Sequence, residues 1–172
     1  VELGPSIALA EGVDVNALGN AVHAFFASDA PARGAAMRLT DARELLRAWR
    51  VEDAMEAAAL VASSEALLRW VDRSWPGAKR LREWPILHRL PSGSVVRGSV
   101  DLVLELDDRL VVIDHKCIGG AFEQVLARAA SYRGQLAAYR AALEAATGKP
   151  VESLWFHLPL DGRAAPVVTR SA

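Results

Sequence analysis

The chain has 172 residues, of which 52% are hydrophobic and 24% charged, with a net charge of −1 at pH 7. These values are typical of one globular domain and exclude a strongly basic protein that binds nucleic acid through its overall charge. A single cysteine, Cys117, excludes intrachain disulfides and any metal site built from several cysteines. No apolar run reaches the roughly 18 residues of a membrane span, and no signal peptide is evident, so we expect a reducing, intracellular location.

Helical periodicity dominates the first 75 residues. Asp14 is placed to cap a first helix, in which apolar residues recur at helical spacing: Val15, Leu18, Val22, Phe25 and Phe26. Residues 28–34 contain Asp, Pro and Gly and break this helix. Thr40 is a candidate cap for a second helix to about residue 50. Residues 53–62 predict an alanine-rich helix, and Ser64 is a candidate cap for a third helix to about residue 73.

Strand-forming segments follow residue 75. We expect strands over 79–90, 100–106, 110–113, 151–158 and 164–169, and helices over 122–130 and 132–146. This order predicts an α/β fold: a mixed central sheet with an antiparallel hairpin core and a crossover helix, plus an N-terminal helical lobe. We expect one domain over residues 1–172, with 1–75 as the lobe and 76–172 as the α/β core. Because the chain begins at Val1, we also expect it to be a piece of a longer protein.

The hairpin at 98–116 carries two acids and a lysine. If the chain reverses at Asp107-Asp108 so that residues 106 and 109 face each other, Asp101 lies directly across from Asp114, with Cβ atoms about 5 Å apart. Lys116 follows Asp114 by two residues and points to the same face. Two facing carboxylates repel, and one lysine leaves the pair net negative. This is the electrostatic character of a divalent metal site built from oxygen ligands.

The same residues resemble the core motif of the PD-(D/E)XK nucleases: an acid, Asp101, followed on the next strand by Asp114-His115-Lys116. Three further elements are similar to the RecB-type subgroup, which is fused to or partnered with DNA helicases. They are Gly19-Asn-Ala-Val-His23, Glu83-Trp-Pro, and Gln135-Leu-Ala-Ala-Tyr139 preceded by Tyr132-Arg133. They occur in the family's order, and they imply a restriction-endonuclease-like fold.

The resemblance implies the following roles. Asp101, Asp114 and Lys116 are the catalytic residues, and the metal ligands are His23, Asp101, Asp114 and the backbone carbonyl of His115. Glu83, Tyr132, Arg133, Gln135 and Tyr139 support the site or bind DNA. The cofactor is Mg²⁺ or Mn²⁺, and a neutral His23 suits Mn²⁺ better than Mg²⁺. His115 and Cys117 depart from the subgroup, which has Tyr and Thr at these positions.

The activity implied is metal-dependent DNA hydrolysis, of exonuclease type, in repair or recombination. The chain lacks a Gly-x-x-x-x-Gly-Lys-Ser/Thr phosphate loop, so a helicase motor must be supplied in cis or in trans. We expect single-stranded DNA ends as the substrate, no membrane association, and a cytoplasmic, nucleoid-associated location in a bacterium.

Each of these assignments has an alternative. His23 is equally typical of a packed, hydrogen-bonded core histidine. Tyr132 and Tyr139 are equally typical of amphipathic core residues whose hydroxyls are solvated. Glu83 is placed either to support metal or water, or to pair with a nearby arginine. Residues 69–82 interleave cations with tryptophans, either as a single-strand binding surface or as a solvated helix face with buried indoles. For the whole chain, the alternatives are a non-catalytic DNA-binding or scaffolding module and a hydrolase of another phosphate ester.

Overall fold

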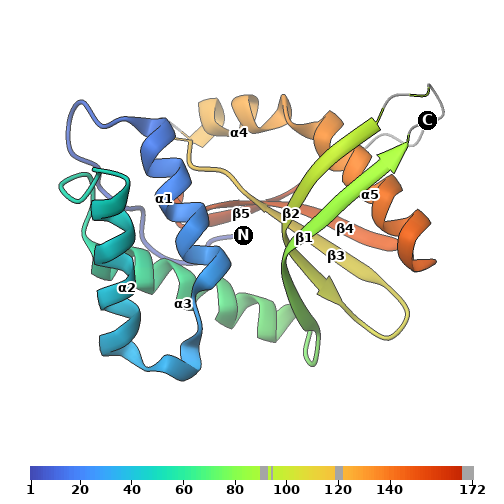
Figure 1. The fold of residues 1–172 in the computed structure, drawn as a ribbon, viewed down its shortest axis with the longest axis horizontal. Helices are drawn as coiled ribbons and strands as arrows, with labels where there is room; N and C mark the ends of the chain where they lie inside the picture. Colours follow the sequence, from blue (N-terminus) through green and yellow to red (C-terminus); the bar gives the residue numbers. More distant parts are fainter. Residues whose placement is uncertain (90–92, 94, 119–121, 168–172) are drawn as a thin grey trace.

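The computed structural model describes residues 1–89, 93, 95–118 and 122–167. Three helices come first, and a five-stranded sheet with two further helices follows (Figure 1). The helices are α1 (Val15–Ser28), α2 (Ala35–Ala48), α3 (Ala57–Ser74), α4 (Phe122–Ala130) and α5 (Arg133–Thr147). The strands are β1 (Lys79–Arg89), β2 (Val95–Glu105), β3 (Leu110–His115), β4 (Val151–Leu158) and β5 (Arg163–Pro166), and short 3₁₀ turns occupy Pro31–Arg33 and Pro159–Asp161.

The sheet has the order β1-β2-β3-β4-β5. Only the β3–β4 pair is parallel, and the chain crosses from one to the other through α4 and α5. The other three pairs are antiparallel. This mixed sheet with a helical crossover and an N-terminal helical lobe confirms the predicted α/β, restriction-endonuclease-like fold. The last residue of the predicted strand 79–90 and the last two residues of the predicted strand 164–169 lie outside the described residues.

The first helix begins as predicted, because the Asp14 carboxylate accepts hydrogen bonds from the backbone N–H groups of Asn16 and Ala17 at 2.9 and 3.1 Å. The predicted start of the second helix is wrong. Helix α2 begins at Ala35, and Thr40 lies inside it, where its hydroxyl donates back to the carbonyl of Ala36. A helix-interior threonine forms this bond readily, so its presence does not mark a helix start.

The prediction of two helices over 53–62 and 64–73 is also wrong. One helix, α3, runs without a break from Ala57 to Ser74. Ser64 is buried in its middle, and its hydroxyl donates to the Asp29 carboxylate at 2.6 Å. Arg38 from α2 donates two hydrogen bonds to the same carboxylate, at 2.7 and 2.8 Å. A serine that looks like a helix cap in sequence is thus part of a buried polar network that joins all three helices of the lobe.

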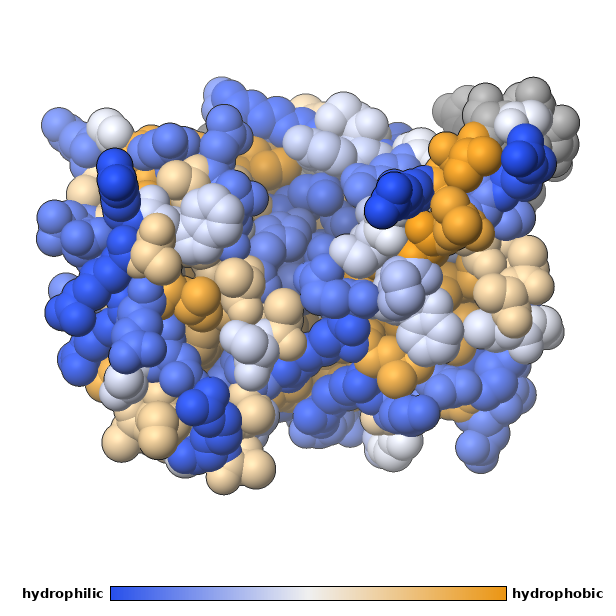
Figure 2. Space-filling view, in the orientation of Figure 1, coloured by the Kyte–Doolittle hydropathy of each residue, from blue (hydrophilic) through white to orange (hydrophobic). Residues whose placement is uncertain are grey.

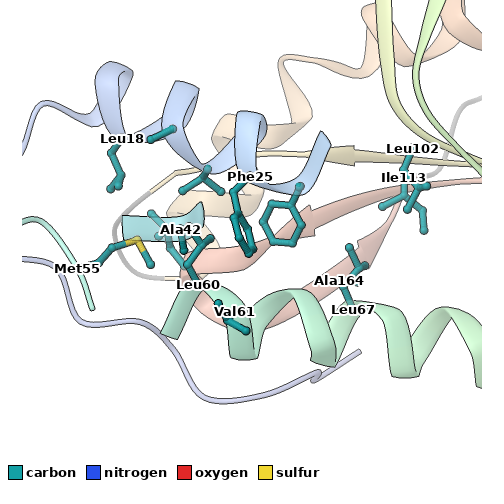
Figure 3. Close-up of a cluster of buried hydrophobic side chains, with 14 of the residues drawn as sticks. Leu18, Phe25, Ala42, Met55, Leu60, Val61, Leu67, Leu102, Ile113 and Ala164 are labelled. Carbon is teal, nitrogen blue, oxygen red and sulfur yellow. The ribbon is translucent and has the colours of Figure 1, made fainter. Parts of the chain in front are cut away.

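Two hydrophobic cores cover the two faces of the sheet. The first lies between α1, α2, α3 and one face, and it includes Phe25, Leu60, Leu102 and Ile113 (Figure 3). The second lies between α5 and the opposite face and includes Val103, Val112 and Leu136. Strand β3 is buried along its whole length, as expected for a central strand that pairs in parallel with one neighbour. The α5 packing confirms that the crossover helix lies against one face of the sheet.

The N-terminal segment is hydrogen-bonded to the chain at and beside β5. The backbone N–H of Leu3 donates to the carbonyl of Gly162 at 2.8 Å, and the Val1 amino group donates to the carbonyl of Ala164 at 2.7 Å. Gly162 adopts a left-handed conformation, with φ of 61°. A Cβ added there would meet the backbone of Gly4 and Pro5 at less than 3.0 Å, so both the conformation and the close approach require glycine.

No helix among the described residues is long and apolar enough to cross a membrane.

Candidate active site

The β2–β3 hairpin has the register that the sequence predicts. Leu102 pairs with Ile113 and Val103 with Val112, and the N–H of Leu106 donates to the carbonyl of Arg109 at 3.0 Å across a tight turn. The last observed pair is Leu102 with Ile113, and the same register continued by one residue places Asp101 opposite Asp114. The geometry also shows how the two acids differ: Oδ2 of Asp101 accepts a hydrogen bond from the backbone N–H of His115 at 2.6 Å, which ties this carboxylate to the end of the neighbouring strand.

Helix α1 contributes His23 to this end of the sheet. Its Nδ1 lies 3.5 Å from Oδ1 of Asp101. Burial lowers the pKa of His23, but the contact with Asp101 outweighs burial and the pKa lies above its ordinary value. Burial raises the pKa of Asp101, yet His23 and the His115 N–H lower it overall. His23 is therefore a polar partner of the acid, a contact that a metal ligand and a packed, hydrogen-bonded histidine would both make.

Asp114 is 2% exposed and carries the most perturbed carboxylate of the hairpin. Burial and the neighbouring charge of Asp101 raise its pKa to about 6, against the opposing effect of Lys116. The Lys116 ammonium lies 2.7 Å from Oδ2 of Asp114, off the direction of a hydrogen bond, so this buried oxygen has an ion pair but no hydrogen-bond donor within the described part of the chain. Two carboxylates with a single ammonium leave this end of the sheet net negative, which favours a further cation.

The donor set fits a divalent cation. Oxygens of Asp101 and Asp114 lie at the same end of the sheet, and oxygen ligands are those that Mg²⁺ and Mn²⁺ prefer. The described residues contain no group of three or more His, Cys, Asp or Glu side chains arranged to hold a metal by themselves. A cation bound here would therefore keep several ligands from water or substrate, as Mg²⁺ commonly does when one or two carboxylates hold it.

The side chain of His115 points away from the two acids. It is buried against Phe26, with ring centroids 4.7 Å apart, and its Nδ1 lies 3.0 Å from Nδ1 of His157. Burial lowers the pKa of His115 to about 4 and holds the pKa of His157 well below its ordinary value. Both rings are neutral at pH 7 and belong to the core. The His115 ring also meets the ring of His23 edge to face, with centroids 5.9 Å apart. Sequence reasoning assigned no role to His157 because nothing in the pattern marks its partner.

Cys117 is partly buried and packs against the first core. Burial raises the pKa of its thiol to about 12, so the thiolate required of a nucleophile is scarce at pH 7.

Two residues of the helix α5 motif form a pair, and the third lies apart from them. Nε2 of Gln135 donates to the hydroxyl of Tyr139 at 2.6 Å, and Tyr139 is buried in the second core. Tyr132 is not part of the helix but precedes its first residue, Arg133. It is 41% exposed, and the Lys116 ammonium lies 4.4 Å from the centre of its ring. Tyr139 is thus a core residue, as the alternative describes, whereas Tyr132 is exposed and lies beside Lys116.

Glu83 lies on β1 at the position opposite Asp101, where the β1–β2 pairing is interrupted and its φ is 48°. Its carboxylate accepts a hydrogen bond from the Ser99 hydroxyl at 2.7 Å. The predicted alternative is an ion pair with Arg82 or Arg97. Within the described part of the chain, the structure shows no ion pair between Glu83 and either arginine, and the Arg82 guanidinium donates instead to the backbone carbonyl of Asp29.

The tryptophans predicted as a single-strand binding surface are in the core. Trp70 and Trp75 are 5% and 9% exposed and pack edge to face, with ring centroids 5.0 Å apart. Trp155 packs on both. The buried-indole alternative is therefore correct for residues 69–82.

A comparison with models of protein families matches residues 3–171 to the PD-(D/E)XK nuclease superfamily. The chain belongs to the PD-(D/E)XK nuclease superfamily. Members of this superfamily are nucleases, and they usually use divalent metal ions, which accords with the paired aspartates and the adjacent lysine at the end of the hairpin. A search of curated proteins finds no match.

Proposed function

We propose that this PD-(D/E)XK protein is a DNA phosphodiesterase of RecB type that uses Mg²⁺ or Mn²⁺. The observation that carries the proposal is the convergence of Asp101, Asp114 and Lys116 at one end of the sheet, with Asp114 Oδ2 buried beside the ammonium and lacking a hydrogen-bond donor. His23 from the helical lobe reaches Asp101. The order of the further elements, from Gly19 to Tyr139, supports the RecB-type subgroup.

Each residue has a part in hydrolysis of a phosphodiester. Asp101 and Asp114 would hold the cation, with the carbonyl of His115 as a further ligand. His23 contacts Asp101, and we propose it as a ligand that would have to move from this contact to reach the cation, because the described side chains form no metal-holding group of three. When bound, the cation supplies Lewis-acid polarisation of the phosphate and activation of water. Lys116 would orient the attacking water and stabilise the charge that develops on the phosphate oxygens. We assign Lys116 this electrostatic role as an ammonium, because it forms a close ion pair with the Asp114 carboxylate.

DNA would be held by residues around this centre. Arg133 is exposed at the start of α5, and Tyr132 is exposed beside Lys116. A positively charged side chain and an aromatic ring are the groups that bind a single strand through its phosphates and bases. We therefore propose single-stranded ends as the substrate, exonuclease action in repair or recombination, and a helicase motor that delivers the strand.

Cleavage of labelled single-stranded and double-stranded DNA in Mn²⁺ tests the proposal. The wild type should cleave, and Asp114→Ala should not. Glu105→Gln is a matched control, because Glu105 lies on β2 like Asp101 but pairs with Lys149 at 2.9 Å, away from the site. It should cleave like the wild type. Binding of DNA without cleavage by the wild type would refute the enzyme and favour a non-catalytic DNA-binding module.

A further inference from the structure

A groove of about 290 Å³ runs from the metal-binding end of the hairpin along helix α1. One wall is the α1 face that ends at His23, and the other is formed by Lys116, Ile118 and Tyr132. The volume is at the lower end of the range for small-ligand pockets, about 300–1,000 Å³, and suits one nucleoside unit. The groove is open to solvent and too small for a duplex, and of the candidate catalytic residues it reaches Lys116.

The chain contains two asparagines, Asn16 and Asn20, and both line this groove. They are four residues apart on α1 and so project from one face of the helix. Both are exposed, and within the described residues neither side-chain amide makes a hydrogen bond. Asparagine is a poor helix former compared with alanine. Among the described residues, these side chains therefore have no hydrogen bond that would compete with a ligand.

The chemistry of the groove fits a nucleobase. A side-chain amide both donates and accepts hydrogen bonds, as the edges of nucleobases do. Tyr132 supplies an aromatic ring. The Lys116 ammonium lies over this ring, and Tyr132 remains 41% exposed. Amides that bind base edges and a ring that stacks on a base are the common means of recognising unpaired nucleotides.

We propose that this groove is a base-binding subsite for the unpaired nucleotide next to the scissile phosphate, with Asn16 and Asn20 as its positioning residues. The proposal rests on the proposed nuclease function and adds to it the residues that hold the substrate. Because the contacts are with the base and not with the reacting phosphate, their loss should weaken binding of the substrate and leave the chemical step intact.

The test compares the full chain with Asn16→Ala/Asn20→Ala and with Ser28→Ala, a control at the opposite end of the same helix. Substrates are a single-stranded oligodeoxynucleotide and a matched oligomer of abasic units, both in Mn²⁺. The double variant should raise KM for the oligodeoxynucleotide by about 10-fold or more with kcat little changed, since each lost hydrogen bond is worth a several-fold change. On the abasic oligomer it should equal the wild type. Alanine favours the helix, so the variant should fold.

Equal kinetics of the wild type and the double variant on the oligodeoxynucleotide would overturn the proposed subsite. An equal loss of activity on both substrates would overturn it as well, because such a loss indicates damage to the catalytic centre. If the wild type cleaves neither substrate, the nuclease proposal fails and equilibrium binding decides on the groove. An affinity for the oligodeoxynucleotide about 10-fold weaker in the double variant then supports it, and an unchanged affinity overturns it.

Discussion

Replacement of Asp114 by asparagine should stabilise the metal-free protein while it abolishes the response to metal. In the metal-free state burial and Asp101 raise the pKa of Asp114 to about 6, net of its ion pair with Lys116. The folded state therefore binds a proton more tightly than the unfolded state, and stability falls as the pH rises from 3.8 to about 6. The difference between the unfolded and folded pKa values of Asp114 corresponds to a loss of at most about 3 kcal/mol in the free energy of unfolding at pH 7.5. The amide has the size of the carboxylate and removes this cost.

The measurement is thermal unfolding of wild type and Asp114→Asn in chelator, at pH 7.5 and pH 5. One kcal/mol shifts Tm by about 2–4 °C in a domain of this size, so the variant should melt up to about 10 °C higher at pH 7.5. The gap should shrink to about half at pH 5, which lies between the unfolded and folded pKa values of Asp114, and it should close only below pH 3.8. Metal at 100 times its Kd should then raise the stability of the wild type by about 2.7 kcal/mol and that of the variant by much less.

Asp108→Asn provides the control, because Asp108 is an exposed acid in the turn of the same hairpin. It should match the wild type in chelator and in metal. A variant at position 114 that melts below the wild type in chelator at pH 7.5 would refute the argument from repulsion. An equal metal-dependent rise in Tm for both proteins would place the cation elsewhere.

Three more changes test other parts of the structure. Lys116→Ala should lower the single-turnover rate of DNA cleavage by about 10²–10³-fold yet keep the metal-dependent rise in Tm; loss of that rise would mean that the lysine organises the metal site. Arg38→Ala leaves Asp29 buried without its partner and should lower the free energy of unfolding in urea by about 3–5 kcal/mol. Burial raises the pKa of Asp29, but its hydrogen bonds with Arg38 and Ser64 lower the pKa overall. The stability that Asp29 contributes is therefore present above pH 3.8 and is lost as the pH falls through the lowered pKa. If the stability of Asp29→Asn fell with decreasing pH as steeply as that of the wild type, this reasoning would be contradicted. Gly162→Ala should lower the free energy of unfolding by about 1–3 kcal/mol and make the N-terminal segment more sensitive to proteolysis. A urea midpoint equal to that of the wild type would show that the N-terminal segment can move to accommodate the added Cβ.

The register of the hairpin was predictable because one local feature determines it. A two-residue polar break between dense apolar runs fixes the pairing, and the paired residues then follow one by one along both strands, as Leu102 and Ile113 show. The meeting of His23 with Asp101 was not accessible in this way. It depends on how the helical lobe packs on the sheet, across 78 positions of sequence, and only the family resemblance placed the two together.

The helical lobe shows where local rules fail. Ser64 and Thr40 are residues that commonly cap helices, and each lies within one. The reason is tertiary: Ser64 bonds the Asp29 carboxylate, which also holds Arg38. A cap is recognised from neighbouring residues, but a buried polar network joins residues 35 positions apart. The tryptophans of residues 69–82 are another example. The cations between them indicate an exposed surface, but the indole rings pack against one another in the core.

Glu83 shows how an irregularity in the sheet shapes the site. Leu81 and Trp84 both contact the second core, although regular alternation would put them on opposite faces. The left-handed conformation of Glu83 between them makes this possible, and a non-glycine residue adopts it at a cost of order 1 kcal/mol. The interruption falls opposite Asp101 and leaves the Glu83 carboxylate exposed beside Ser99. Strand propensity cannot predict such a residue, since strain of this kind persists only where the surrounding structure imposes it. Its position across from a candidate metal ligand is the structural argument for a role of Glu83 in the water network of the site.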